Sequence, residues 1–156
     1  MHPGDVAEDE PSEHLRFWAY LAEFAQVADA DELAVVARVL GDPHSTMAES
    51  AVVQHIDRRA RDLHLGPAFE PWAEAMTRAT AGHPFLVRRL QEWSLFRALM
   101  LGQPWDPAVL LESSGWLQRK VAATPGHEAL QLLADSGPSK RIRNSARASL
   151  KQQGST

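Results

Sequence analysis

The sequence predicts an all-α fold, and three observations lead to that prediction. Apolar residues recur three or four positions apart along most of the 156-residue chain. Residues that favour helix starts and helix ends stand between these apolar segments. No alternation of Val, Ile or Thr lasts four residues, and no Asn-Gly or Asp-Gly pair is present to close a hairpin. The loops that the sequence predicts between these helices are short, and short loops favour a stack of antiparallel helix pairs.

The first half of the chain predicts three helices, over residues 12–28, 29–41 and 46–65. The first begins at a capping Ser and carries an apolar stripe at helical spacing, which Leu15 and Trp18 widen. We expect this stripe to face the core and the tryptophan to pack there. The other two begin with the residue pairs of a capping box. The apolar residues of the first helix are Leu15, Phe17, Trp18, Leu21 and Phe24, and the capping pairs are Asp29 with Glu32 and Thr46 with Glu49.

The second half predicts six shorter helices. Proline at the first helical position predicts three of them, because there its missing N–H costs nothing. Ser113 or Ser114 caps the fourth, Thr124-Pro125 opens the fifth, and the sixth follows a Ser-Gly-Pro turn. The expected ranges are 71–81, 84–101, 107–112, 116–123, 124–135 and 139–152.

Charge and composition predict the domain organisation. Residues 1–11 are acidic with little to bury, so we expect a disordered leader, followed by one helical domain over 12–152 and a frayed tail over 153–156. Residues 1–50 carry 11 acidic and 2 basic side chains, whereas residues 51–156 carry 9 acidic and 14 basic ones. Such asymmetry favours head-to-tail self-association or a charged partner at one end.

Two segments share a helix–turn–helix layout, residues 31–56 and 127–150. Four residues after the turn proline comes a large apolar residue, Met47 or Ile142, and four further on comes Ala. The second segment, with its Ile-Arg-x-x-Ala-x-x-x-Leu pattern over 142–150, resembles a HEAT-type repeat. That resemblance implies a HEAT-like α-solenoid that binds another macromolecule; the alternative is an irregular multi-helix domain.

No recognised catalytic pattern is present in the sequence. There is no Cys, no His pair four residues apart, no Gly-x-Ser-x-Gly and no phosphate-binding glycine loop. We therefore expect no enzyme, no cofactor and no metal. No apolar run is long enough to cross a membrane and the first residues do not resemble a signal peptide, so we expect a cytoplasmic protein. An excess of 13 Arg over 3 Lys is typical of a GC-rich bacterial genome.

The remaining hypothesis is a binding module whose partner is a protein or, alternatively, nucleic acid. For a protein partner the candidate contacts are Trp105, in a loop that two prolines stiffen, and the cations Arg88, Arg89 and Arg119. The alternative for Trp105 is a lid folded onto the core. For nucleic acid the candidates lie on one face of the last expected helix: Lys140, Arg143, Arg147 and Lys151. A small-molecule pocket between helices is the third class.

Overall fold

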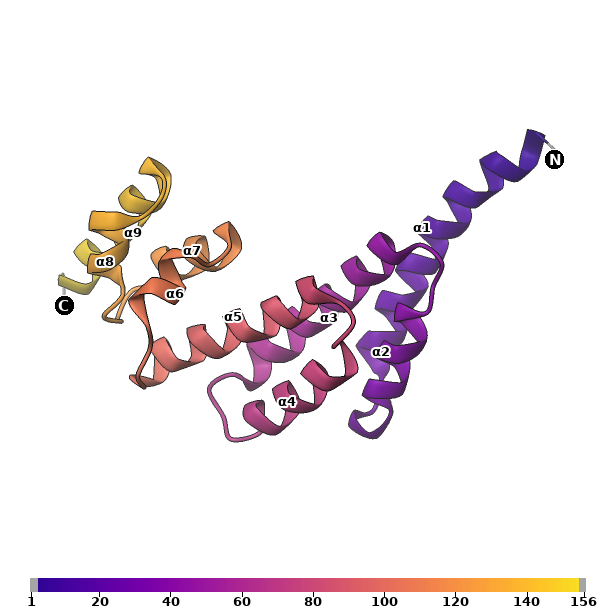
Figure 1. Ribbon diagram of the computed structural model, residues 1–156, viewed down its shortest axis with the longest axis horizontal. Helices are drawn as coiled ribbons and strands as arrows, with labels where there is room; N and C mark the ends of the chain where they lie inside the picture. Colours follow the sequence, from indigo (N-terminus) through magenta and orange to yellow (C-terminus); the bar gives the residue numbers. More distant parts are fainter. Residues whose placement is uncertain (1–2, 155–156) are drawn as a thin grey trace. The chain divides into compact units, whose positions relative to one another are not determined.

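Helices make up all the regular structure of residues 3–154, which the computed structural model describes; side chains are described from residue 12. No strand occurs in that range, so the all-α prediction is confirmed. The helices are α1 (Pro3–Gln26), the 3₁₀ turn η1 (Asp29–Asp31), α2 (Glu32–Leu40), α3 (Ser45–Leu63), α4 (Phe69–Ala79), α5 (Pro84–Leu101), α6 (Pro107–Leu111), α7 (Gly115–Ala122), α8 (Leu130–Ser136) and α9 (Lys140–Gly154) (Figure 1).

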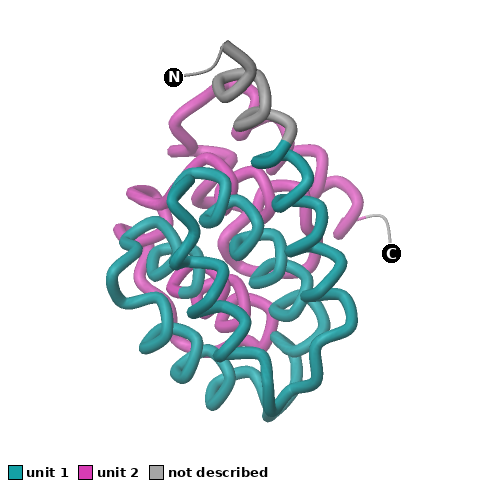
Figure 2. The backbone as a smooth tube through the Cα atoms, turned by 90° about the vertical axis from the view of Figure 1, so that its right-hand side faces the viewer, with its two compact units in different colours: residues 1–90 teal, residues 91–156 magenta. Residues whose placement is uncertain are grey.

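The chain divides into two compact units, residues 1–90 and 91–156 (Figure 2). In the first unit the buried core is built from side chains of α1 to α5, including Phe24, Ile56, Phe69, Met76 and Leu86. In the second unit the core includes Trp93, Leu110, Leu117, Leu130 and Leu133. The single domain over 12–152, the leader and the frayed tail remain predictions, and residues 1–2 and 155–156 lie outside the described residues.

Local signals set several helix ends where the sequence predicts them. α5 begins at Pro84 and is followed by Gly102, whose φ of 68° is the left-handed conformation that glycine adopts at helix ends. Ser114 caps α7, because its side chain accepts a hydrogen bond from the backbone N–H of Leu117. α1 begins at Pro3, earlier than the helix expected from Ser12.

Four predictions about helix starts are wrong: the capping boxes of α2 and α3, the start of α4 at Pro71, and the start of α8 at Thr124. α4 begins two residues before Pro71, at Phe69. Neither capping box forms, since α2 and α3 have no side-chain cap. Glu32 contacts His55 of α3 instead, and Glu49 contacts His83, the residue before α5. α8 begins at Leu130 rather than at Thr124, because Gly126 takes a φ of 93° that interrupts a helix.

The two segments with a shared layout form the helix pairs α2–α3 and α8–α9. Their matching positions are buried in both pairs: Met47 and Ala51 in the first, Ile142 and Ala146 in the second. The small Ala at each crossing lets the paired helices approach closely. The helix-pair layout is therefore confirmed at these positions.

Candidate functional site

The outer face of α1 is apolar and uncovered. Leu15 is 70% exposed and Trp18 is 64% exposed, and Ala19 and Ala22 beside them are exposed as well. These positions follow an i, i+3, i+4, i+7 spacing, so they share one face of the helix. The expected core positions of Leu15 and Trp18 are therefore wrong. α1 is buried only through its other face, which carries Phe24 at 2% exposure.

A hollow of about 500 Å³ lies between α1 and the first turns of α3. Its floor is apolar, from Phe17 and Met47, and its rim is polar. The ring of Trp18 meets the ring of Phe17 edge-on, with 5.4 Å between their centroids. Trp18 therefore stands beside this hollow, whose polar rim consists of Glu13, His14, Thr46 and Ser50.

A second hollow, of about 190 Å³, lies further along the same two helices. It is lined by Leu21 and Phe24 of α1 and by Gln54, His55 and Arg58 of α3. On α1 the lining positions 14, 17, 21 and 24 share one face, and on α3 positions 47, 50, 54 and 58 do the same. The two hollows thus follow one groove, which we call the α1/α3 groove.

Ion pairs and hydrogen bonds hold α1 in place beside this groove. Arg16 binds the Asp42 carboxylate with both Nε (2.8 Å) and Nη2 (3.2 Å), and the Tyr20 hydroxyl donates to it at 2.7 Å. The Arg16 hydrogen bond, with those of Tyr20 and the His44 backbone N–H, holds the pKa of the buried Asp42 carboxyl well below its usual range. At the other end, Arg58 Nη2 donates to the Phe24 carbonyl at 2.7 Å.

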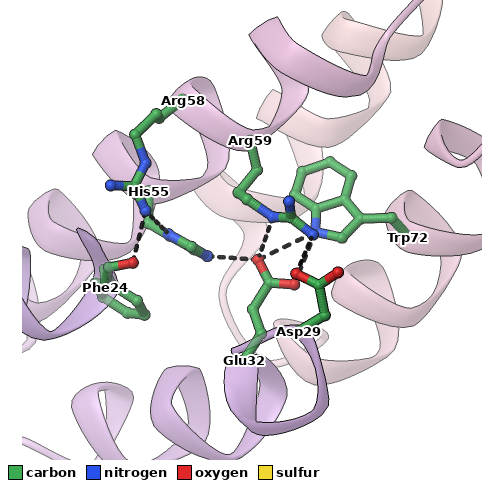
Figure 3. Close-up of polar contacts among 7 residues, drawn as sticks. All are labelled: Phe24, Asp29, Glu32, His55, Arg58, Arg59 and Trp72. Carbon is green, nitrogen blue, oxygen red and sulfur yellow. Dashed lines mark hydrogen bonds and ion pairs between the residues drawn. The ribbon is translucent and has the colours of Figure 1, made fainter. Parts of the chain in front are cut away.

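A buried carboxylate joins the helices behind the groove. Glu32, 4% exposed, accepts hydrogen bonds from His55 Nε2 (2.6 Å), Arg59 Nε (3.0 Å) and Trp72 Nε1 (3.1 Å) (Figure 3). Burial alone raises the pKa of Glu32, but hydrogen bonds from His55, Arg59 and Trp72 outweigh it and lower that pKa to about 2. The carboxylate is therefore ionised at neutral pH and connects α2, α3 and α4.

The hydrogen-bonding roles of the two His55 ring nitrogens follow from their neighbours. Its Nδ1 lies 3.2 Å from Arg58 Nη2, a donor, so Nδ1 accepts and Nε2 carries the hydrogen donated to Glu32. The ring also stacks on Phe24, with 4.3 Å between centroids. Both ring nitrogens are thus engaged, and the arrangement fixes helices in place and leaves His55 no free nitrogen with which to accept a substrate proton.

A third hollow, of about 300 Å³, lies beside the Glu32 cluster between α2, α3 and α4. Its walls are mostly apolar, with Leu33, Leu63 and the Trp72 ring among them. The Asp29 carboxylate at its edge is 88% exposed and lies 3.3 Å from Arg59 Nη2. Because Arg59 already pairs with two carboxylates, this hollow has no uncompensated cation with which to hold an anion.

The predicted protein-contact residues are divided between the two units. In the first, Arg88 is exposed, whereas Arg89 is half-buried with its Nε 3.5 Å from Asp57. In the second, Arg119 is exposed and Trp105 is half-buried, with its Nε1 donating to Glu128 at 2.7 Å. Trp105 is thus neither a fully exposed anchor nor a lid closed onto the core.

The basic face of α9 carries the four predicted nucleic-acid contacts, and two of them are engaged inside the unit. Arg143 donates to the Gly137 carbonyl at 2.8 Å, and Arg147 donates to the Ala134 carbonyl at 3.1 Å. These arginines satisfy carbonyls at the end of α8, as cations near a helix C-terminus do. Lys140 and Lys151 have exposed side chains.

The comparisons with known proteins add no assignment: no family model, no curated protein and no solved structure matches this chain. Among the described residues, no helix combines the length and the apolar character that a membrane crossing requires. The α1 face and the α1/α3 groove were not foreseen from the sequence. The signal that pointed to them is the breadth of the apolar surface on this helix, which exceeds what one packing face covers.

Proposed function

We propose that this protein is a non-enzymatic binding module that recognises a protein partner through the exposed apolar face of α1. The observation that carries the proposal is that Leu15 and Trp18 are the two most exposed large apolar side chains of the described residues. A contiguous apolar patch on a surface helix is typical of an interaction site. Tryptophan in particular is over-represented among the residues that dominate binding energies.

The polar contacts behind α1 support the same proposal. A face used for recognition gains affinity when it is held in its bound conformation beforehand. Arg16 and Tyr20 tie one part of α1 to Asp42, and Arg58 ties its end to α3. This proposal gives a secondary role to the contacts predicted from the sequence, which are Trp105, Arg88, Arg89 and Arg119. The indole N–H of Trp105 already donates a hydrogen bond to Glu128.

The test is affinity capture of the tagged full chain from a bacterial lysate, with and without nuclease, followed by direct binding measurements on the identified partner. Trp18→Ala should weaken that binding by more than about 1 kcal/mol, the usual threshold for an important interface residue. The matched control is Val109→Ala, which removes an apolar side chain of 52% exposure from α6. Circular dichroism establishes that both variants remain folded.

The outcomes separate protein from nucleic acid. Equal binding by wild type and Trp18→Ala contradicts the role of α1. Recovery that disappears with nuclease, or in a variant with Ala at Lys140, Arg143, Arg147 and Lys151, favours nucleic acid instead.

A further inference from the structure

We propose that the hollow between α2, α3 and α4 binds a small molecule that carries a protonated amine on an apolar body. We call this hollow the Trp72 pocket. Its volume of about 300 Å³ lies at the lower end of the range for small-molecule sites, about 300–1,000 Å³. None of its lining residues belongs to α1, so the inference goes beyond the proposed function and does not depend on it.

The walls of the Trp72 pocket are apolar, and its aromatic wall is held in place. The apolar lining residues are Leu33, Leu63, Ala68, Trp72 and Ala75. Trp72 Nε1 donates to both oxygens of the buried Glu32 carboxylate, at 3.1 and 3.2 Å, and this contact fixes the indole ring (Figure 3). A wall that is already ordered takes up the apolar body of a ligand at a low entropic cost.

The charged side chains of the lining select the charge of the ligand. They are the carboxylates of Asp29 and Glu32 and the guanidinium of Arg59. Arg59 contacts both carboxylates, Asp29 through Nη2 at 3.3 Å and Glu32 through Nε at 3.0 Å. Two negative charges therefore face one positive charge, and the lining keeps a net negative charge. A cationic ligand complements that charge, whereas an anionic ligand is repelled by it.

Asp29 is the carboxylate that pairs with the ammonium of the ligand. Glu32 is 4% exposed, and its oxygens already accept hydrogen bonds from His55, Arg59 and Trp72. The Asp29 side chain is 88% exposed and contacts Arg59 through Oδ1, and no described residue donates to its Oδ2. The ammonium thus binds at the rim of the pocket, and the apolar body of the ligand packs against Leu33 and the Trp72 ring.

Three ligands of similar shape and different charge test the proposal. Phenethylamine is a cation at neutral pH, phenethyl alcohol is uncharged and hydrocinnamate is an anion. In NMR titrations of the isotopically labelled full chain, the amine should bind saturably, and the alcohol about threefold to fivefold more weakly. That ratio corresponds to one ion pair at an exposed carboxylate. The anion should bind more weakly still. No saturable binding of the amine, or equal affinities for the amine and the alcohol, overturns the inference.

A matched pair of variants tests the role of Asp29. Asp29→Asn and Asp31→Asn each remove one carboxylate from the turn η1, but Asp31 does not line the pocket. We expect Asp29→Asn to weaken the amine about threefold to fivefold and the alcohol less than about twofold. Asp31→Asn should change either affinity by less than about twofold. An equal effect of the two variants indicates diffuse attraction to an acidic surface and contradicts the site.

A second pair of variants tests the apolar wall. Leu33 lines the pocket at 39% exposure, whereas Leu65 is 58% exposed and is not a lining residue. Leu33→Ala should weaken the amine and the alcohol alike, by about threefold or more, because both ligands share the apolar contact. Leu65→Ala should leave both affinities unchanged. Circular dichroism establishes that each variant is folded, and a folded Leu33→Ala variant with wild-type affinities overturns the inference.

A capped lysine distinguishes a free amine from a lysine side chain of a partner protein. Both present an ammonium on an apolar stem. The capped lysine should bind more weakly than phenethylamine, because its flexible chain loses more rotational freedom and has no ring to pack against Trp72. Tighter binding of the capped lysine overturns the assignment to a small molecule.

Discussion

Replacing Glu32 by Gln tests whether one buried carboxylate holds α2, α3 and α4 together. The substitution keeps the side-chain shape but removes the charge that His55, Arg59 and Trp72 surround. The pKa of Glu32 lies at about 2 instead of the usual 4.5. A pKa difference of one unit between the folded and unfolded chain corresponds to about 1.36 kcal/mol of folding free energy. The ionised carboxylate therefore contributes about 3 kcal/mol to folding at neutral pH.

The sign of the pH dependence follows from the direction of this shift. Because the pKa is lower in the folded than in the unfolded chain, the contribution of Glu32 is fully present above about pH 4.5. It is lost progressively as the pH falls from there towards about 2, where the folded carboxylate is protonated too. The difference in unfolding free energy between wild type and Glu32→Gln should shrink over the same interval.

The assay is urea unfolding at several pH values between 7 and 3, with circular dichroism as the measure of unfolding. Hydrogen exchange measured on peptides of α2, α3 and α4 assigns the loss to the first unit. Glu74→Gln is the control, since its carboxylate is 75% exposed and pairs with Arg78 in the same helix. That control should stay within about 0.5 kcal/mol of wild type. A Glu32→Gln difference below about 1 kcal/mol, or one unchanged between pH 7 and pH 3, refutes the reasoning.

Four further substitutions, one of them a control, have defined outcomes in thermal or urea unfolding. Gly137→Ala should lower the free energy of unfolding by about 1–3 kcal/mol, because its new Cβ would lie 2.5 Å from a backbone oxygen of α8. Gly82→Ala is the control: its new Cβ meets no atom within 4 Å, so the change should be neutral or slightly stabilising. Trp105→Phe should cost less than about 1 kcal/mol, since it removes one exposed hydrogen bond and keeps the ring packing. Ser149→Ala should cost about 1–3 kcal/mol, because the buried carbonyl of Ala122 loses a donor at 2.6 Å. A neutral result for Gly137→Ala or Ser149→Ala, or a large loss for Trp105→Phe, contradicts these local accounts.

Features that depend on neighbouring residues could be predicted from the sequence. The start of α5 at Pro84 and a cap at Ser113 or Ser114 need only a few adjacent residues to form. Both predictions are confirmed, and the cap is Ser114. The positions of Met47 and Ile142 in their helix pairs were also predicted, because helical spacing alone places them on the packing face.

Features that depend on distant helices could not be predicted in the same way. Asp29 and Glu32 have the spacing of a capping box, and nothing local reveals that Trp72, forty positions later, binds the same carboxylate. For α1 the difficulty is different. Leu15, Trp18 and Phe24 occupy several directions around the helix, so periodicity does not decide which side meets the core and which remains exposed.

The Glu32 cluster also constrains how this sequence can change during evolution. Replacing Glu32 alone leaves buried donors without an acceptor, and replacing His55 or Arg59 alone leaves a buried anion short of its donors. Replacing the whole group together by apolar residues of similar volume leaves neither unpaired buried donors nor an unpaired buried anion. Relatives of this chain should therefore carry Glu, His, Arg and Trp at positions 32, 55, 59 and 72 together, or lose them together.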